Sequence, residues 1–198
     1  TRLFDAHGLV EWRKSQESVV RPSVTALLLK ALANSYAGSK SVHSERHLNL
    51  ANINDGKITS VRIGVATDTP RGLVVPVLEV ELSQTASQIG LQLVELVALA
   101  RGGNLGIDHV KEADITLSNL GAYGVDFGQP IIPPGQSAMV FVGALKKRPM
   151  VIKEQVVARE TVYITIASDH RVIDGAAAAG ILGMIGEFVE LISENSLV

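Results

Sequence analysis

The chain has 198 residues, of which 46% are hydrophobic and 4% aromatic, and its formal net charge at pH 7 is −2. This length favours one ordinary domain with a sizeable core of Val, Leu, Ile and Ala, and the scattered Lys and Arg exclude the basic footprint of a nucleic-acid-binding protein. The chain contains no cysteine, which excludes disulfides, thiolate metal sites and a cysteine nucleophile.

The chain is predicted to begin with two helices. A short helix is expected from Asp5 to about Lys14. A longer one is expected over Ser23–Ala37, where apolar residues recur at helical spacing after the start signals Pro22 and Ser23. The polar stretch Gly38–Asn54 predicts a loop.

The middle of the chain predicts two strands followed by a helix. Ile58–Thr67 and Leu73–Val80 are rich in β-branched residues and flank a Thr-Pro-Arg-Gly turn. A helix is expected over Ser83–Arg101, with Ser83 as its N-cap and Gly102-Gly103 as its stop signal.

The last part of the chain predicts three short strands and a helix. The strands are expected over Asp114–Ser118, Ala138–Leu145 and Val162–Ala167, and the helix over Gly175–Ser193 with Asp174 as its N-cap. The longest run of small and apolar residues is too short and glycine-rich to span a bilayer. Helices and strands mix without strict alternation, which predicts an α+β domain with a mixed sheet.

The segment from Ser168 to Gly175 is the best candidate for chemistry. It joins a predicted strand to an alanine-rich helix, and such a junction can hold a side chain rigidly at the mouth of a sheet. A neutral imidazole such as that of His170 is a natural base near pH 7, because its reference pKa is about 6.5. The residues alone do not decide whether His170 is catalytic or merely exposed or structural. Asp174 fits a helix cap equally well.

His170-Arg171-Val172-Ile173-Asp174-Gly175 resembles the His-x-x-x-Asp-Gly signature of the dihydrolipoyl acyltransferases of 2-oxoacid dehydrogenase complexes, which chloramphenicol acetyltransferase shares. Three further stretches resemble this family in the same order. They are Ile63–Ala66 with Thr69–Val77, Thr116–Gly121 with Gly124, and Pro130–Ile132 through Gln136–Ala138 to Val142-Gly143.

The resemblance implies a chloramphenicol acetyltransferase-like fold: α+β, two layers, a mixed β-sheet with helices packed on one face, forming trimers. We expect residues 1–198 to be one acyltransferase catalytic domain whose N-terminal part is missing, with no lipoyl or peripheral-subunit-binding domain. The family's site lies between subunits, and coenzyme A and lipoamide enter it from opposite ends. A homotrimer at least, within a possibly larger core, is therefore expected.

The implied reaction moves an acyl group between a dihydrolipoyl thiol and coenzyme A. By resemblance, His170 is the general base, Ser118 donates a hydrogen bond to the tetrahedral oxyanion, and Asp174 supports the loop that carries His170. No acyl-enzyme and no metal are involved. The residues that match coenzyme A contacts of the family are Arg13, Ser23, Asp68, Ser118, Asn119, Gly143 and Leu145.

The resemblance also implies partners and a compartment. The lipoyl group is carried by another domain or chain, and the partners are a lipoyl domain, the decarboxylase and dihydrolipoyl dehydrogenase, with no nucleic acid or membrane. The segment Ser118–Gly121 followed by Tyr123-Gly124 favours acetyl over succinyl or branched-chain groups. The expected location is the cytoplasm, or the matrix of a mitochondrion or plastid in a eukaryote.

Three alternatives compete with this interpretation. A non-catalytic scaffold subunit of the same complexes is the main one, although such subunits tend to lose the signature histidine. A serine hydrolase would use Ser137, which stands in half of a Gly-x-Ser-x-Gly elbow whose second glycine is missing. A metal site at His43 and His47 lacks a third ligand, so we expect these residues to be solvated.

Overall fold

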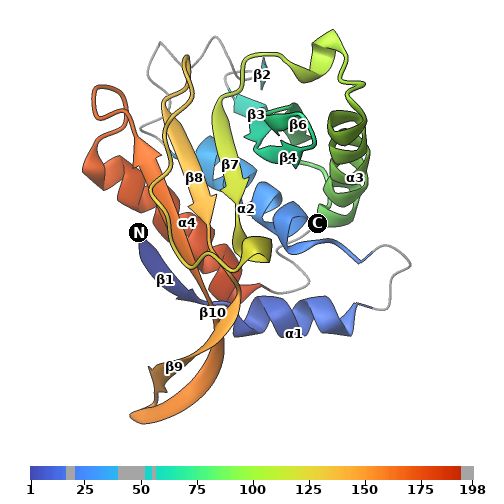
Figure 1. The fold of residues 1–198 in the computed structure, drawn as a ribbon. Helices are drawn as coiled ribbons and strands as arrows, with labels where there is room; N and C mark the ends of the chain where they lie inside the picture. The colour runs from blue at the N-terminus through green and yellow to red at the C-terminus, as the bar shows by residue number, and fades with distance from the viewer. Residues whose placement is uncertain (17–20, 40–51, 55–56, 193–198) are drawn as a thin grey trace.

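The fold is built on a mixed eight-stranded sheet, seen in a computed structural model that describes residues 1–16, 21–39, 52–54 and 57–192 (Figure 1). The strand order is β1-β10-β8-β7-β3-β2, with β6 paired to β3 and β9 paired to β10. These strands are β1 (Arg2–Asp5), β2 (Asn52–Asn54), β3 (Lys57–Val65), β6 (Val77–Glu81), β7 (Ile115–Asn119), β8 (Ala138–Val142), β9 (Lys146–Ile152) and β10 (Gln155–Ser168).

The centre of the sheet is parallel and its flanks are antiparallel. β3, β7 and β8 run in the same direction, whereas β10 runs antiparallel to β8. The register places Ser118 of β7 opposite Phe141 of β8, and Ser168 of β10 opposite Ala138 of β8. Consequently, the C-terminal ends of β7 and β10 lie at opposite ends of the sheet along the strand direction.

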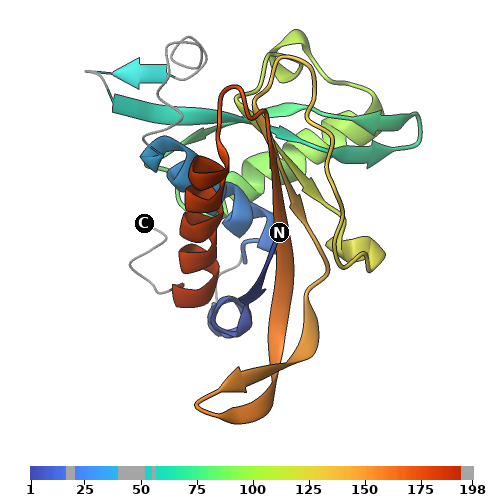
Figure 2. The ribbon, with the colours of Figure 1, turned by 90° about the vertical axis from the view of Figure 1, so that its left-hand side faces the viewer.

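In the part of the chain that the structure describes, the second layer consists of the helices α1 (His7–Ser15), α2 (Val24–Gly38), α3 (Ala86–Gly102) and α4 (Gly175–Leu191). α2 lies at the centre of this layer, packs against α3, α4 and β3, and buries Leu27, Leu29 and Leu32 completely or nearly so. Figure 2 shows α2 and α4 side by side on one side of the sheet. Burial of aliphatic side chains between the two layers forms the core, as the composition predicts.

Helix capping explains where the helices begin. Ser23 caps α2 by accepting a hydrogen bond from the Ala26 amide at 3.1 Å, and Asp174 caps α4 as predicted. The expected cap of α3 at Ser83 is wrong. Thr85 caps it instead, because Thr85 and Gln88 form a reciprocal capping box. α3 ends at Gly103, whose φ of 71° is the left-handed conformation that glycine favours.

The predicted strand Leu73–Val80 is divided in the structure. Its first part belongs to β5 (Gly72–Val74), which pairs with β4 (Thr67–Thr69) in a separate two-stranded hairpin, and its second part is β6. Pro76 lies between them, and proline has no amide hydrogen for a ladder bond. The hairpin therefore leaves the main sheet and lies beside α3.

Strands β1, β2 and β9 were not predicted. β2 lies at the end of the predicted loop Gly38–Asn54, of which residues 40–51 lie outside the described residues. β1 pairs with β10, so α1 begins at His7 rather than at Asp5. β9 and the first half of β10 form a long hairpin that extends away from the body of the molecule (Figures 1 and 2). The predicted helix end at Ser193 lies outside the described residues. None of the helices in the described ranges is both long and apolar enough to cross a membrane.

Candidate active site

His170 lies in a turn that joins β10 to α4, and the backbone of this turn is held from both sides. The Asp169 amide donates to the Ser137 carbonyl at 2.8 Å, and the Ile173 amide donates to the Asp169 carbonyl at 2.9 Å. The Asp169 carboxylate accepts from the Arg171 backbone amide at 3.0 Å and from its guanidinium at 2.6 Å. The turn is thus fixed to β8 and to itself.

The side chain of His170 is exposed, and its imidazole makes no hydrogen bond with any residue in the described ranges. A methyl group placed on Gly175 would lie 4.0 Å from His170 Nε2, so the ring lies over the first turn of α4. The Asp174 carboxylate accepts from the Ala177 amide at 2.8 Å, which makes it the cap of this helix. Asp174 therefore fixes the helix start that follows His170, while the ring itself is free to meet a ligand.

Ser118 and Asn119 occupy the end of β7, at the end of the sheet opposite to the His170 turn. The Ser118 side chain is buried, and its hydroxyl has no hydrogen-bond partner within the described part of the chain. The Asn119 amide group donates to Thr25 Oγ1 at 3.0 Å, and its Oδ1 accepts from the Gly121 amide at 2.9 Å. These bonds connect the end of β7 to the first turn of α2 and leave the Ser118 hydroxyl available as a donor.

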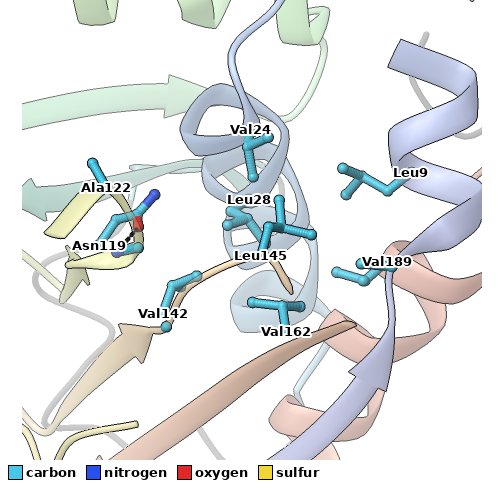
Figure 3. A pocket seen from close by; sticks show the side chains of 12 residues that line it. Leu9, Val24, Leu28, Asn119, Ala122, Val142, Leu145, Val162 and Val189 are labelled. Carbon is cyan, nitrogen blue, oxygen red and sulfur yellow. Dashed lines mark hydrogen bonds between the residues drawn. The ribbon is translucent and has the colours of Figure 1, made fainter. Parts of the chain in front are cut away.

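Two cavities meet at Asn119. The first has a volume of about 220 Å³ and is mainly apolar (Figure 3). It is lined by Ala6, Leu9, Val24, Leu28, Asn119, Gly121, Ala122, Val142, Gly143, Leu145, Val162 and Val189. The second has a volume of about 320 Å³ and shares Asn119 and Ala122 with the first. Its polar and charged lining residues are Thr25, Thr67, Asp68, Arg101, Ser118, Asn119 and Tyr123.

The structure brings most of the predicted coenzyme A residues to these cavities. Asn119, Gly143 and Leu145 line the first cavity, and Asp68 and Ser118 line the second with Asn119. Gly143 has no room for a side chain, because the carbonyl oxygen of Asp126 occupies the place where a Cβ would lie.

The two remaining predicted contacts, Arg13 and Ser23, lie where α1 and α2 approach each other. Arg13 Nε donates to the Pro22 carbonyl at 2.9 Å, directly before the cap Ser23.

Sequence reasoning named Tyr123 only in connection with the acyl group, and it missed both the contact of Tyr123 with Asp68 and the apolar wall of the first cavity. The Tyr123 hydroxyl donates to Asp68 Oδ2 at 2.9 Å across the second cavity, and this bond to a carboxylate raises the pKa of Tyr123. Leu9, Val24 and Leu28 line the first cavity but stand at helical core positions. No feature of the sequence separates a leucine that lines a cavity from one that fills a core.

His170 and Ser118 do not meet within one chain. Asp169 is level with Ser137, the residue before β8, whereas Ser118 is level with Phe141 of β8, a difference of about 13 Å along the strands at roughly 3.3 Å per residue. β8 also separates β10 from β7. In both ribbon views the turn between β10 and α4 lies at the far end of the sheet from the end of β7 (Figures 1 and 2).

The structure also bears on the alternatives. Ser137 is 2% exposed, lies behind the His170 turn and leads into β8, so it does not fit the exposed nucleophile of a hydrolase elbow. His43 and His47 lie outside the described residues.

Comparison with known proteins gives one family over almost the whole chain. Residues 1–197 match the family of 2-oxoacid dehydrogenases acyltransferase (catalytic domain). A probable dihydrolipoyllysine-residue succinyltransferase component of the mitochondrial 2-oxoglutarate dehydrogenase complex of Schizosaccharomyces pombe is 37% identical over 65% of this chain and 28% of that protein. The acetyltransferase component of the pyruvate dehydrogenase complex of Mycoplasma capricolum is 30% identical over 87% of this chain and 39% of that protein. The chain thus spans less than two fifths of the length of these relatives.

Comparison with solved structures finds proteins of the same family. The cubic core of the pyruvate dehydrogenase multienzyme complex is 29% identical, with a TM-score of 0.83 over 95% of this chain and 79% of that one. The same values hold for Azotobacter vinelandii dihydrolipoamide acetyltransferase, in which the catalytic roles of a serine, a histidine and an asparagine were investigated. Chloramphenicol acetyltransferase, at 11% identity and a TM-score of 0.54 over 96% of this chain and 86% of that one, shows the fold alone and confirms the predicted fold class.

Proposed function

The chain belongs to the family of 2-oxoacid dehydrogenase acyltransferase catalytic domains, and we propose that it transfers an acyl group between a dihydrolipoyl thiol and coenzyme A. One observation carries this proposal. Ser118, His170 and Asp174 have the same spacing along the chain as the serine, histidine and asparagine investigated in the Azotobacter vinelandii acetyltransferase. The exposed imidazole and the free serine hydroxyl suit the two roles that the reaction requires.

The proposed chemistry is a direct thiol exchange on a thioester. The attacking thiol has a reference pKa near ~8.5, so little thiolate exists at neutral pH. His170 takes the thiol proton as sulfur attacks the carbonyl carbon, and Ser118 donates a hydrogen bond to the oxyanion that forms. The tetrahedral intermediate collapses with cleavage of its other carbon–sulfur bond, and the departing sulfur recovers the proton from His170.

The separation of His170 from Ser118 supports a site shared between two copies of the chain. One copy would present the imidazole at the turn between β10 and α4, and the neighbouring copy would present Ser118 with its two cavities. A closed ring with the same contact repeated between neighbours makes every such site equivalent. We propose a trimer as this ring, and the likeness to the cubic core supports assembly into a larger core.

The two cavities on either side of Asn119 support two substrates that approach from different directions. Each cavity reaches the end of β7, and Ser118 lies in the wall of the second. An acyl group held at this point could be reached by a thiol from either side. The proposed cofactor substrates are coenzyme A and a lipoyl group carried by another domain or chain.

We propose acetyl as the acyl group. The relatives include both acetyltransferases and succinyltransferases, so the family leaves the acyl group open. Among the described residues, the lining of the first cavity contains no charged side chain that could hold the free carboxylate of a succinyl group. Rates with acetyl-, succinyl- and isobutyryl-coenzyme A in one assay would rank the three.

The broader setting follows from the relatives. We propose that the chain acts with a lipoyl domain, a 2-oxoacid decarboxylase and dihydrolipoyl dehydrogenase, in the cytoplasm or in an organelle matrix. Mixing the purified chain with an isolated lipoyl domain and measuring acyl-lipoyl formation by mass spectrometry tests the first of these partners.

The direct test is transfer from acetyl-coenzyme A to dihydrolipoamide. Acyl transfer that exceeds the uncatalysed rate and collapses in His170→Ala, while the oligomer persists, is the expected result. A wild-type chain that assembles but transfers no acyl group from any of the three donors would instead identify a scaffold subunit.

A further inference from the structure

The segment that leads into β8 carries the backbone contact that holds the His170 turn. The ladder between β10 and β8 ends with the pair Ser168 and Ala138. One residue further on, the Asp169 amide donates to the Ser137 carbonyl at 2.8 Å. His170 is the next residue along the chain, so a shift of Ser137 passes directly to the backbone that carries the imidazole.

The residue before Ser137 is bonded to the neighbouring strand. Thr116 Oγ1 of β7 donates to Gln136 Oε1 at 2.7 Å. The Gln136 amide donates to the Pro133 carbonyl at 3.2 Å, which closes a turn in which Gly135 has a φ of 82°. This segment belongs to no strand or helix. The bond between Thr116 and Gln136 therefore ties an irregular piece of chain to the sheet.

The Thr116 hydroxyl has a fixed place. Thr116 is completely buried, and it is level with Gly64 of β3 on one side and with Met139 of β8 on the other. A Cβ on Gly64 would lie 2.5 Å from Thr116 Oγ1 and 2.9 Å from a methyl group of Val75, so the hydroxyl occupies space that a glycine leaves open. A donor confined in this way gives its bond to Gln136 one geometry, as a positioning contact requires.

We propose that Gln136 and Thr116 are positioning residues for His170. Their hydrogen bond places Ser137, the Ser137 carbonyl places the Asp169 amide, and the turn then presents the imidazole to the attacking thiol. The inference rests on the proposed function and deepens it, because it names residues that set the position of the general base. Neither side chain lines either of the two cavities that meet at the end of β7.

Steady-state transfer kinetics test the bridge through the separate responses of kcat and KM. Thr116→Val and Gln136→Leu each remove one end of the hydrogen bond with little change of shape. Each is expected to lower kcat about ten- to a hundredfold with KM changed no more than about twofold, because a base misplaced by about 1 Å loses rate without losing substrate. Thr116→Ser keeps the donor and Gln136→Glu keeps the acceptor, so both should recover most of the lost rate.

Thr161→Val is the matched control. Thr161 is also a completely buried threonine of the sheet, and its hydroxyl donates to the Lys146 carbonyl at 3.1 Å and accepts from Arg148 Nη1 at 2.8 Å. These bonds lie at the base of the β9–β10 hairpin and not at the His170 turn. Thr161→Val should therefore lower the thermal midpoint and leave kcat, measured well below that midpoint, near the wild-type value.

A double-variant cycle separates an effect through His170 from an independent one. In a His170→Ala background, Thr116→Val should lower the residual rate no further, because no imidazole is left to position. Hydrogen exchange measured by mass spectrometry then reads the bridge without turnover. Exchange across residues 168–173 should be faster in Thr116→Val than in wild type, since the Asp169 amide loses a firmly placed acceptor, and unchanged in Thr161→Val.

Four results would overturn the inference. They are a wild-type kcat in both Thr116→Val and Gln136→Leu, an equal fall of kcat in Thr161→Val, a further loss of rate when Thr116→Val is added to His170→Ala, or unchanged exchange across the turn in Thr116→Val. Failure of the proposed function has a different signature. The difference in exchange would then persist in a chain that transfers no acyl group from any donor.

Discussion

The turn that carries His170 and the end of β7 that carries Ser118 are opposites. The turn is firmly held by backbone hydrogen bonds, but its imidazole is exposed and none of the lining residues of the two cavities belongs to it. The end of β7 has two cavities and the hydroxyl of Ser118, but no histidine of the described ranges lines either cavity. Each region has what the other lacks, and this difference supports the proposal that one chain carries two halves of different sites rather than one whole site.

Loss of the base should have the largest effect. His170→Ala is expected to lower kcat by roughly a hundred to ten thousandfold, because general-base assistance is removed. The thermal midpoint should not change, since the side chain is exposed and has no hydrogen bond in the described structure. Steady-state kinetics and calorimetry on His170→Ala measure both quantities. A kcat within a factor of two of wild type would remove His170 from the chemistry.

Loss of the oxyanion donor should come next. Ser118→Ala is expected to lower kcat by about a hundred to a thousandfold with little change in KM, because the hydrogen bond matters most in the transition state. Ser118→Thr keeps a hydroxyl and is the matched variant. If Ser118→Ala raised KM and left kcat unchanged, the end of β7 would bind substrate without taking part in the chemistry. Only the His170 turn would then be catalytic.

Substitutions of Asp174 can separate its role as the cap of α4 from any role of its negative charge in the reaction. Asp174→Ala should cost about 1 kcal/mol of stability through loss of the cap, with a smaller loss of activity than His170→Ala. Asp174→Asn keeps the cap, so it should restore both quantities. Urea unfolding and kinetics on the two variants check this, and low activity with full stability in Asp174→Asn would show a need for the charge itself.

The smallest expected effect is on stability, from a change at Glu160 in β10. This strand leads into the His170 turn at one end and forms the hairpin with β9 at the other. The hydrogen bond from His7, 2.6 Å between Nδ1 and Glu160 Oε2, holds the pKa of Glu160 below its usual value of 4.5. A depressed carboxyl pKa gives stability that is complete above the unfolded value and is lost as the pH falls through the folded value. The gap in melting temperature between wild type and Glu160→Gln should therefore narrow below about pH 4.5. A gap that widens in acid would contradict this pairing.

Most of the fold could be predicted from the sequence because its signals are local. Ser23 and Asp174 stand before apolar helical runs, so the starts of α2 and α4 follow from side-chain capping. The start of α3 was misplaced because both Ser83 and Thr85 are cap types, and only Gln88 three residues after Thr85 decides between them. β1 depends on pairing with β10, a long-range contact that no local pattern of the sequence reveals. β9 and β10 form a local hairpin, but its turn residues Lys153 and Glu154 have positive φ without the Asn or Gly that usually marks such a turn.

The candidate site was predicted in parts for the same reason. The His170 motif is contiguous, so the sequence shows it directly. The meeting of Asn119, Gly143 and Leu145 around one cavity followed from the family resemblance rather than from spacing. The sequence does not show the contact of Tyr123 with Asp68, because the two residues are brought together only when the chain folds back on itself.

The most direct test of a shared site is complementation between two inactive chains. His170→Ala and Ser118→Ala chains are coexpressed, the mixed oligomers are purified, and transfer from acetyl-coenzyme A to dihydrolipoamide is measured. If His170 of one copy serves Ser118 of its neighbour, random assembly restores roughly a quarter of the sites, and activity rises far above either parent. Activity equal to the average of the two parents, in oligomers shown by mass spectrometry to contain both chains, would contradict a site completed between copies.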